Sequence, residues 1–187
     1  ARGYACVTTR EPGGTPIGAQ IRGVLLDPAN NSLDPGAELL LYVADRIQHI
    51  RTVIMPHLKA GKTVLCDRFF DATLVYQGYA RGLSKTLIKD LHRLVCDDLR
   101  PDLTILFDLD PETGLGRAWG QIDSGDRTSA ESRFEAEKID FHRKVRQGYL
   151  ELARSEPDRF RIVDAAEPLP NVAQAIGAAL NAFLDDR

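Results

Sequence analysis

Short apolar runs alternate along the chain with longer stretches in which apolar positions recur every three or four residues. The short runs predict β-strands, and the periodic stretches predict helices with one buried face. The expected strands cover residues 4–8, 63–66, 103–107 and 160–163. The expected helices begin after Thr15, Asp34, Ser84 and Asp110, and two more cover residues 133–154 and 169–184. Because strands and helices alternate, the pattern predicts an α/β fold, with a parallel sheet and right-handed crossovers.

Local residues indicate where several helices begin and end. Thr15 and Asp34 each precede a proline, the arrangement of an N-cap before the first helical position. We expect Pro56 to kink or end the second helix and Gly61 to stop it. Residues 63–66 predict a strand that is buried on both faces. The helix positions expected to face inward are Ile17, Ile21, Leu25, Leu39, Val43, Ile47, Ile50, Ile54, Leu87, Leu91, Leu94 and Val95.

Composition limits the classes of function. The chain has 187 residues, 43% of them hydrophobic, which is typical of one globular domain with a sizeable core. A net charge of −3 provides no drive toward nucleic acid or a membrane surface, and no apolar stretch is long enough to span a membrane. Cys6, Cys66 and Cys96 lack the spacing of a zinc site or a disulfide framework. Cys6 and Cys66 are expected to be buried thiols, and a reducing cytoplasm is the favoured compartment.

Charged residues and glycines follow the first expected strand in residues 9–15, Thr-Arg-Glu-Pro-Gly-Gly-Thr. Ligands of open α/β sheets bind outside the carboxyl ends of the strands, so Arg10 and Glu11 are placed for a charged small molecule. A tight turn followed by a helix cap explains the segment equally well. Asp67 and Arg68 end the second strand in the same way. They predict an arginine that binds phosphate beside a carboxylate facing hydrated Mg²⁺; the alternative is a surface ion pair.

Two pairs of side chains, each four positions apart, are candidates for contacting a nucleobase. Thr73 and Gln77 share one face if this segment is helical, and Gln77 offers both a donor and an acceptor. Tyr42 and Arg46 could stack on a base and hydrogen-bond its edge. The alternative is that Tyr42 belongs to the core and Arg46 is solvated.

Three motifs in this order resemble those of bacterial thymidylate kinases, which transfer the γ-phosphoryl group of ATP to dTMP. Residues 9–15 are similar to the family's Thr-Arg-Glu-Pro-Gly-Gly motif, and residues 67–78 to its Asp-Arg-Tyr…Ser-Ser…Tyr-Gln-Gly signature. Residues 133–137 resemble the arginine-bearing end of its lid. The resemblance implies one nucleoside-monophosphate-kinase-like domain over residues 1–187. Its implied fold is a P-loop-kinase-like parallel sheet flanked by helices, with a helical lid at roughly residues 117–135.

The resemblance also implies roles for individual side chains. The residues expected to bind dTMP are Glu11, Pro12, Tyr42, Arg46, Arg68, Thr73 and Gln77. Arg68 would hold the phosphate and Tyr42 would stack on thymine, whereas the other polar side chains would line the pocket or address the edge of the base. The arginines expected to stabilise charge on the transferred group are Arg10, Arg68, Arg117, Arg127 and Arg133. ATP is the implied co-substrate, Mg²⁺ with a water-mediated contact to Asp67 is the implied metal ion, and the implied assembly is a homodimer.

One motif of the family does not occur in residues 1–187. There is no glycine-rich G-x-x-x-x-G-K-[ST] loop for the ATP phosphates, and Gly61-Lys62-Thr63 imitates only the end of one. Because the family carries that loop in an N-terminal strand–loop–helix unit, we expect the unit to be absent from this chain and two strand edges to be unpaired. We then expect negligible phosphoryl transfer by these residues alone. Two alternatives stay open: a kinase for another nucleoside monophosphate such as dUMP, and a non-catalytic nucleotide-binding or scaffold protein.

Overall fold

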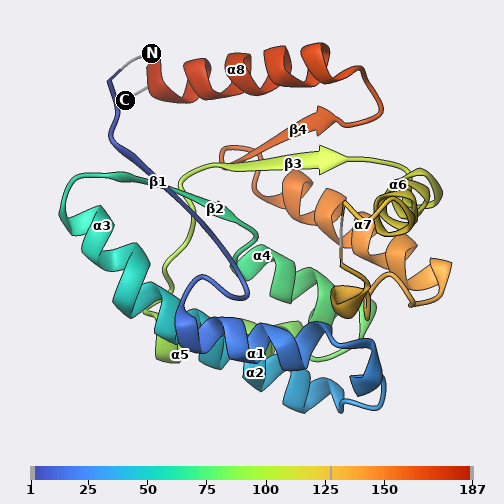
Figure 1. The fold of residues 1–187 in the computed structure, drawn as a ribbon. Helices are drawn as coiled ribbons and strands as arrows, with labels where there is room; N and C mark the ends of the chain where they lie inside the picture. Colours follow the sequence, from blue (N-terminus) through green and yellow to red (C-terminus); the bar gives the residue numbers. More distant parts are fainter. Residues whose placement is uncertain (1–2, 127, 186–187) are drawn as a thin grey trace. The chain divides into compact units, whose positions relative to one another are not determined.

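The structure, a computed structural model, describes residues 3–126 and 128–185. The chain forms two compact units, one of residues 1–99 with 128–137 and one of residues 100–127 with 138–187. Each unit contains one parallel pair of strands together with helices, drawn in Figure 1. Parallel strands flanked by helices confirm the predicted α/β fold.

The first unit is built around β1 (Cys6–Arg10) and β2 (Thr63–Asp67). The two strands pair in parallel, with Cys6 opposite Thr63 at one end and Arg10 opposite Asp67 at the other. Their carboxyl ends therefore lie side by side. This register brings together two motifs that are more than 50 residues apart in the sequence.

Helices and single helical turns make up the rest of the first unit. They are α1 (Pro16–Leu26), η1 (Pro28–Asn30), α2 (Pro35–His49), η2 (Ile50–Ile54), α3 (Met55–Lys59), α4 (Phe70–Thr73), η3 (Leu74–Ala80), α5 (Lys85–Cys96) and η4 (Ser129–Glu131). The predicted caps are confirmed, because Thr15 accepts a hydrogen bond from the Gly18 backbone at 2.8 Å and Asp34 accepts from Gly36 at 2.8 Å. Helix α2 packs against both α1 and α5.

Pro56 does not end the second helical stretch, which continues as η2 and α3 to Lys59. The turn before the proline is π-helical, and this widened spiral accommodates a residue that has no N–H to donate. Gly61 follows with a φ of +71°, a left-handed conformation that favours glycine, and confirms the predicted stop.

The predicted inward face of α2 is confirmed, whereas the predicted inward face of α5 is wrong. Most of the apolar positions predicted on α2 and η2 are buried: Leu39, Val43, Ile50 and Ile54. In α5 the buried residues are instead Ile88, His92 and Cys96, whereas Leu94 is 78% exposed and Leu87 is also exposed. His92 is buried because its ring stacks on Phe70 at 4.0 Å and its Nε2 contacts the carbonyl of Leu99 at 2.8 Å.

The prediction that residues 63–66 form a strand buried on both faces is also wrong. Side chains along β1 and β2 alternate between exposed and half-buried positions, and Leu65 and Cys6 are both exposed. Within the described residues each of these strands has one hydrogen-bonded neighbour, so the pair buries less surface than a wide sheet covered on both sides. Ile17 on α1, predicted to face inward, is likewise exposed.

The second unit contains β3 (Thr104–Asp108) paired in parallel with β4 (Phe160–Asp164). Its helices are α6 (Pro111–Asp123), α7 (Ile139–Ser155) and α8 (Leu169–Asp185). The long helix predicted from residue 133 begins only at Ile139, since residues 128–137 belong to the first unit. The range predicted as a lid covers the end of α6 and η4, and its function as a lid stays a prediction. Among the residues described, no helix is long and apolar enough to cross a membrane.

Candidate functional site

Polar side chains cluster where β1 and β2 end. Arg10 lies opposite Asp67, and the Glu11 backbone N–H donates to the carbonyl of Asp67 at 2.9 Å, which extends the pairing by one residue. Arg68 follows with a φ of +64°, a conformation that side-chain-bearing residues seldom adopt and that costs on the order of 1 kcal/mol. Arg10, Asp67 and Arg68 are exposed. The strand ends therefore present two arginines and one carboxylate to solvent.

A buried ion pair lies behind these exposed charges. Glu11 pairs with the Nη2 atom of Arg46, and the same nitrogen donates to Oγ1 of Thr73 at 2.6 Å. Arg46 is only 1% exposed, and its guanidinium lies 5.5 Å from the centre of the Phe69 ring. The alternative reading of Arg46 as a solvated side chain is therefore wrong. The structure brings three predicted site residues together in the interior of the first unit.

Two residues that the sequence analysis did not single out belong to the same cluster. His49 is fully buried, with Nε2 2.7 Å from Oγ1 of Thr9 and Nδ1 3.6 Å from Oε2 of Glu11. Asp45 is also buried and accepts a hydrogen bond from the Gly13 backbone at 3.2 Å. Burial raises the pKa of Asp45, and the hydrogen bond from Gly13 opposes that shift.

A sequence signal for these residues exists on α2. Glu38, Asp45, Arg46 and His49 recur at helical spacing among the apolar positions of that helix, and all four are buried. Charged residues on a buried helix face need partners, because removing a charge from water is unfavourable. Polar residues at core spacing therefore indicate a buried network, although the sequence does not identify its partners.

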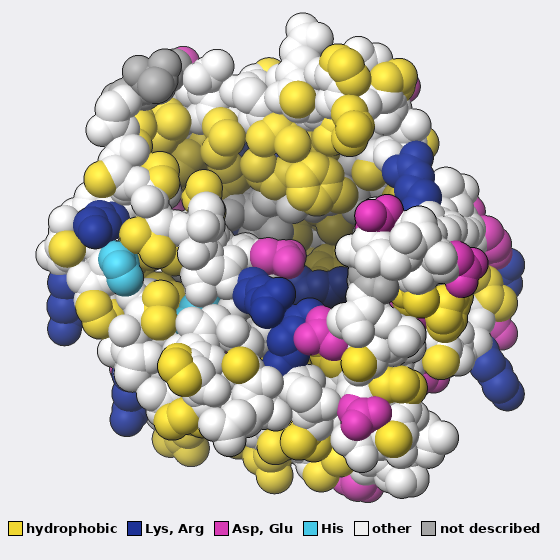
Figure 2. All heavy atoms as spheres, viewed as in Figure 1, with side chains coloured by type: hydrophobic (Ala, Val, Ile, Leu, Met, Phe, Trp, Pro, Cys, Tyr) yellow, Lys and Arg dark blue, Asp and Glu magenta, His cyan; other side chains and the backbone are white. Residues whose placement is uncertain are grey.

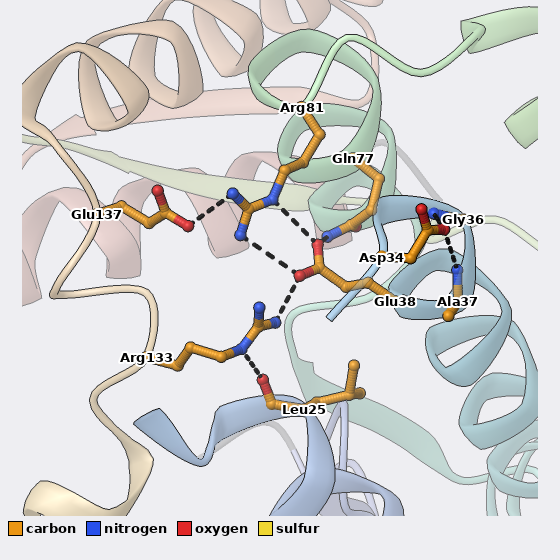
Figure 3. A network of polar contacts seen from close by, with 9 residues as sticks. All are labelled: Leu25, Asp34, Gly36, Ala37, Glu38, Gln77, Arg81, Arg133 and Glu137. Carbon is orange, nitrogen blue, oxygen red and sulfur yellow. Dashed lines mark hydrogen bonds and ion pairs between the residues drawn. The ribbon is translucent and has the colours of Figure 1, made fainter. Parts of the chain in front are cut away.

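A second network surrounds Glu38, as Figure 3 shows. The Glu38 carboxylate accepts a hydrogen bond from Nε2 of Gln77 at 2.8 Å and from Nη2 of Arg133 at 2.5 Å. Arg81 approaches both carboxylate oxygens at 3.4 Å and pairs with Glu137 at 2.6 Å. Glu38 is only 1% exposed, so two guanidinium groups and one amide satisfy its carboxylate away from bulk water.

The predicted lid arginines lie in different parts of the molecule. Arg133 is buried in the first unit, where its Nε also donates to the carbonyl of Leu25. Arg117 belongs to the second unit and donates to the carbonyl of Ala165 at 2.9 Å. Arg127 lies outside the described residues. No role in charge stabilisation follows from these positions, and the lid assignment stays a prediction.

Tyr42 and Pro12 border the same networks. Tyr42 is half-buried on α2, and burial raises the pKa of its phenol well above the usual value, while the charge of Arg68 opposes this shift. The ring of Tyr76 lies under the guanidinium of Arg68, and the Cζ atom of Arg68 is 5.1 Å from the ring centre. Pro12 is buried, and its carbonyl accepts a hydrogen bond from Arg22 at 3.0 Å. The Tyr76 ring therefore lies beside Arg68, and the Tyr42 hydroxyl lies close enough to Glu38 to feel the charge of its carboxylate.

The second unit contains a cavity of about 790 Å³ beside Arg117. Its walls are Phe107 on β3, Arg117 and Gln121 on α6, residues 165–169 after β4, and the first turns of α8. The cavity combines an aromatic ring and aliphatic side chains with a planar guanidinium. Such a surface suits a flat heterocycle that stacks and accepts hydrogen bonds at its edge.

Figure 2 shows charged side chains of both signs, Lys or Arg in blue and Asp or Glu in magenta, near the centre of the drawn view. Within the part of the chain that the structure describes, no three His, Cys, Asp or Glu side chains are grouped so as to hold a metal ion. Asp67, exposed at the end of β2, has the carboxylate chemistry for a mainly hydrated Mg²⁺.

Comparisons with known proteins identify the family of this chain. A family model described as thymidylate kinase matches residues 1–176. The thymidylate kinase of Desulfosudis oleivorans is 54% identical over 183 residues, covering 98% of this chain and 86% of the relative. That of Desulforapulum autotrophicum is 58% identical over 179 residues, covering 96% of this chain and 79% of the relative. The chain belongs to the thymidylate kinase family.

Proposed function

We propose that the protein transfers the γ-phosphoryl group of ATP to dTMP, giving dTDP. The observation that carries the proposal is the register of β1 and β2, which sets Arg10 opposite Asp67. Arg68 and Glu11, which pairs with the buried Arg46, each follow directly at the same end of the strands. Exposed arginines at the ends of parallel strands suit a phosphate, and the side chains behind them suit a neutral polar base. Close relatives named thymidylate kinases support the choice of substrate.

Arg68 binds the phosphate of dTMP in this proposal, with Arg10 as a second contact. Both side chains are exposed at the strand ends, and a planar guanidinium donates two parallel hydrogen bonds to phosphate oxygens. The left-handed backbone of Arg68 supports the assignment, because strained residues persist where a function requires their geometry.

The base is held by side chains on α2, α4 and η3. Thr73 already accepts from Arg46, so its own hydroxyl hydrogen is available to a carbonyl oxygen of the base. Tyr42 supplies the stacking face and Gln77 a further hydrogen bond, while Pro12 bounds the pocket. A methyl group in an apolar pocket changes binding by only about 1–3 kcal/mol, so a moderate preference for dTMP over dUMP is expected.

ATP binds through the second unit in this proposal. Its purine base occupies the cavity beside Arg117, where the guanidinium stacks on the heterocycle. Residues 1–187 contain no G-x-x-x-x-G-K-[ST] loop, so no segment of them is assigned to the ATP phosphates. Asp67 contacts Mg²⁺ through water, and the ion supplies charge neutralisation when bound. Arg133 and Arg127 stay candidates for stabilising the transferred group.

A homodimer is also proposed. The apolar face of α2 and η2 belongs to the core, since Leu39, Val43, Ile50 and Ile54 are buried. Leu40, one residue further along α2 and about 100° around the helix from Leu39, is 58% exposed and is the better candidate for a contact between copies. Light scattering tests this: the expected mass is twice 20.7 kDa, and Leu40→Lys is expected to halve it.

Two measurements test the function. Calorimetric titration with dTMP, and with dAMP as the control ligand, is expected to show saturable binding of dTMP alone. Formation of dTDP from ATP and dTMP tests turnover. Selective binding without turnover by any form of the protein would favour a nucleotide-binding scaffold. Absence of dTMP binding by a folded sample would contradict the site assignment.

A further inference from the structure

We propose that Glu38 is a positioning residue that sets the hydrogen-bond polarity of Gln77, so that the acceptor site selects bases with a ring N–H and rejects cytosine. The inference deepens the proposed function and rests on it. Glu38, a buried carboxylate, would then decide which class of pyrimidine the site accepts.

The polarity of Gln77 follows from the chemistry of its partner. Its amide nitrogen lies 2.8 Å from Oε1 of Glu38. An ionised carboxylate only accepts hydrogen bonds, so the amide must present its NH₂ group to Glu38 and cannot be turned over without losing that bond. The amide oxygen of Gln77 is consequently held on the opposite side. The direction of this side chain is therefore a consequence of the Glu38 charge.

Glu38 itself is held in place from two sides. Arg133 donates to Oε2, and Arg81 spans both oxygens while its own Nη1 pairs with Glu137 at 2.6 Å (Figure 3). The two arginines come from different segments, since Arg133 lies just after η4 and Arg81 directly follows η3. A carboxylate bound by two guanidinium groups has little freedom to rotate, so the orientation of Gln77 is fixed before any ligand arrives.

The amide oxygen of Gln77 needs a hydrogen-bond donor. Gln77 is 0% exposed, and within the described residues its Oε1 has no hydrogen-bond partner. A buried acceptor left without a donor is unfavourable, so the oxygen requires an N–H or O–H from a ligand or from water. Tyr42 and Thr73, the other side chains proposed to contact the base, belong to the same unit.

The donor that fits is the ring N–H of a 2,4-dioxopyrimidine. Thymine and uracil carry a hydrogen on N3 between two carbonyl groups, whereas N3 of cytosine is a lone-pair acceptor. An amide oxygen facing N3 therefore binds thymine or uracil and repels cytosine. If the NH₂ group of Gln77 faced the base instead, the preference would reverse. Glu38 determines which of these occurs.

The test compares three nucleotides on the wild-type protein and on Glu38→Gln by calorimetric titration. In the variant the new amide can either accept or donate, so Gln77 is free to turn over. We expect the ratio of dissociation constants for dCMP and dTMP to fall by at least about tenfold, since a reversed buried hydrogen bond is worth on the order of one factor of ten or more. The ratio for dUMP and dTMP should not change, because both bases keep the N3 hydrogen.

Glu137→Gln is the matched control. It removes the other ion-pair partner of Arg81 and leaves the contact between Glu38 and Gln77 intact. The proposal would be overturned if the dCMP to dTMP ratio fell as much in this control as in Glu38→Gln. Such a result would indicate that the base pocket had become less rigid as a whole. An unchanged ratio in a folded Glu38→Gln protein would overturn it as well.

Gln77→Leu tests the proposal if Glu38→Gln does not fold. It removes the amide and leaves Glu38 with both arginines, so the dCMP to dTMP ratio should again fall while the dUMP to dTMP ratio stays constant. An unchanged dCMP to dTMP ratio here would overturn the proposal. Failure of the proposed function has a different result, since the wild-type protein would then not bind dTMP at all.

Discussion

The hydroxyl of Thr9 lies 2.7 Å from Nε2 of His49, and this contact joins the end of β1 to the end of α2. The other ring nitrogen, Nδ1, lies 3.6 Å from Oε2 of Glu11. The hydroxyl can donate to Nε2 while Nδ1–H faces the carboxylate, so the contacts favour one tautomer of the imidazole. His49 thereby supports both sides of the segment that leads to the proposed phosphate site.

His49→Ala is expected to destabilise the protein by about 2–4 kcal/mol, because it leaves a cavity and removes a buried partner of Glu11. Urea denaturation measures the effect. Thr9→Val is the control for the hydrogen bond alone, with an expected loss of about 1 kcal/mol. A loss in His49→Ala no larger than that in Thr9→Val would contradict the supporting role.

Arg46→Met is expected to cost about 3–5 kcal/mol, since Glu11 would keep a buried charge without its main partner. The double variant Arg46→Met with Glu11→Gln should recover a substantial part of that loss, because the unpaired charge is gone. Both are measured by denaturation as a double-mutant cycle. Additive effects of the two substitutions would contradict the coupling between these residues.

The raised pKa of Asp45 predicts that this residue weakens the fold as pH rises. Burial raises the folded-state pKa above the ordinary value of 3.8, so between those two values the folded state binds more protons than the unfolded chain. Stability contributed by the group is then present at low pH and is lost as pH rises through the folded-state pKa. Asp45→Asn should therefore gain stability relative to wild type from about pH 4 upward. Denaturation from about pH 3 to about pH 8 measures this difference, and a difference independent of pH would contradict the prediction.

Gly14→Ala is expected to destabilise the protein by about 1–3 kcal/mol. A methyl group there would lie 2.5 Å from Nε2 of His49 and 2.7 Å from the carbonyl of Arg10, and neither atom can move freely. Gly23→Ala in α1 is the control, because a methyl group there meets no atom within 4 Å, and it should stabilise the helix by about 0.5–1 kcal/mol. Equal thermal shifts in the two variants would refute the close packing at Gly14.

Arg68→Ala is expected to weaken binding of dTMP by about ten- to a hundredfold, because it removes a charge-assisted contact with the phosphate. Thymidine, which has no phosphate, should bind the variant and the wild-type protein alike. Calorimetric titration of both ligands separates a phosphate contact from a change in the base pocket. Parallel weakening of thymidine and dTMP would argue against the assignment of Arg68.

Local chemistry in the sequence was sufficient for much of the fold. Thr15 and Asp34 cap their helices as predicted, and Gly61 ends a helical stretch with a positive φ. These features depend on residues within a few positions of one another, so a linear sequence contains the information. The same reasoning placed Arg10 and Arg68 at strand ends, where the parallel register brings them to one edge.

The tertiary structure decided which polar residues are buried and what they contact. Arg46 meets Thr73 from 27 positions away, and Gln77 meets Glu38 from 39 positions away, so no local pattern contains these pairs. It also decided the inward face of α5, where a stacked His92 is buried and Leu94 is exposed. Burial of a side chain depends on the free energy of the whole packed neighbourhood. Hydrophobicity along one helix reports only part of that energy, and hydrogen-bonded partners from distant segments supply the rest.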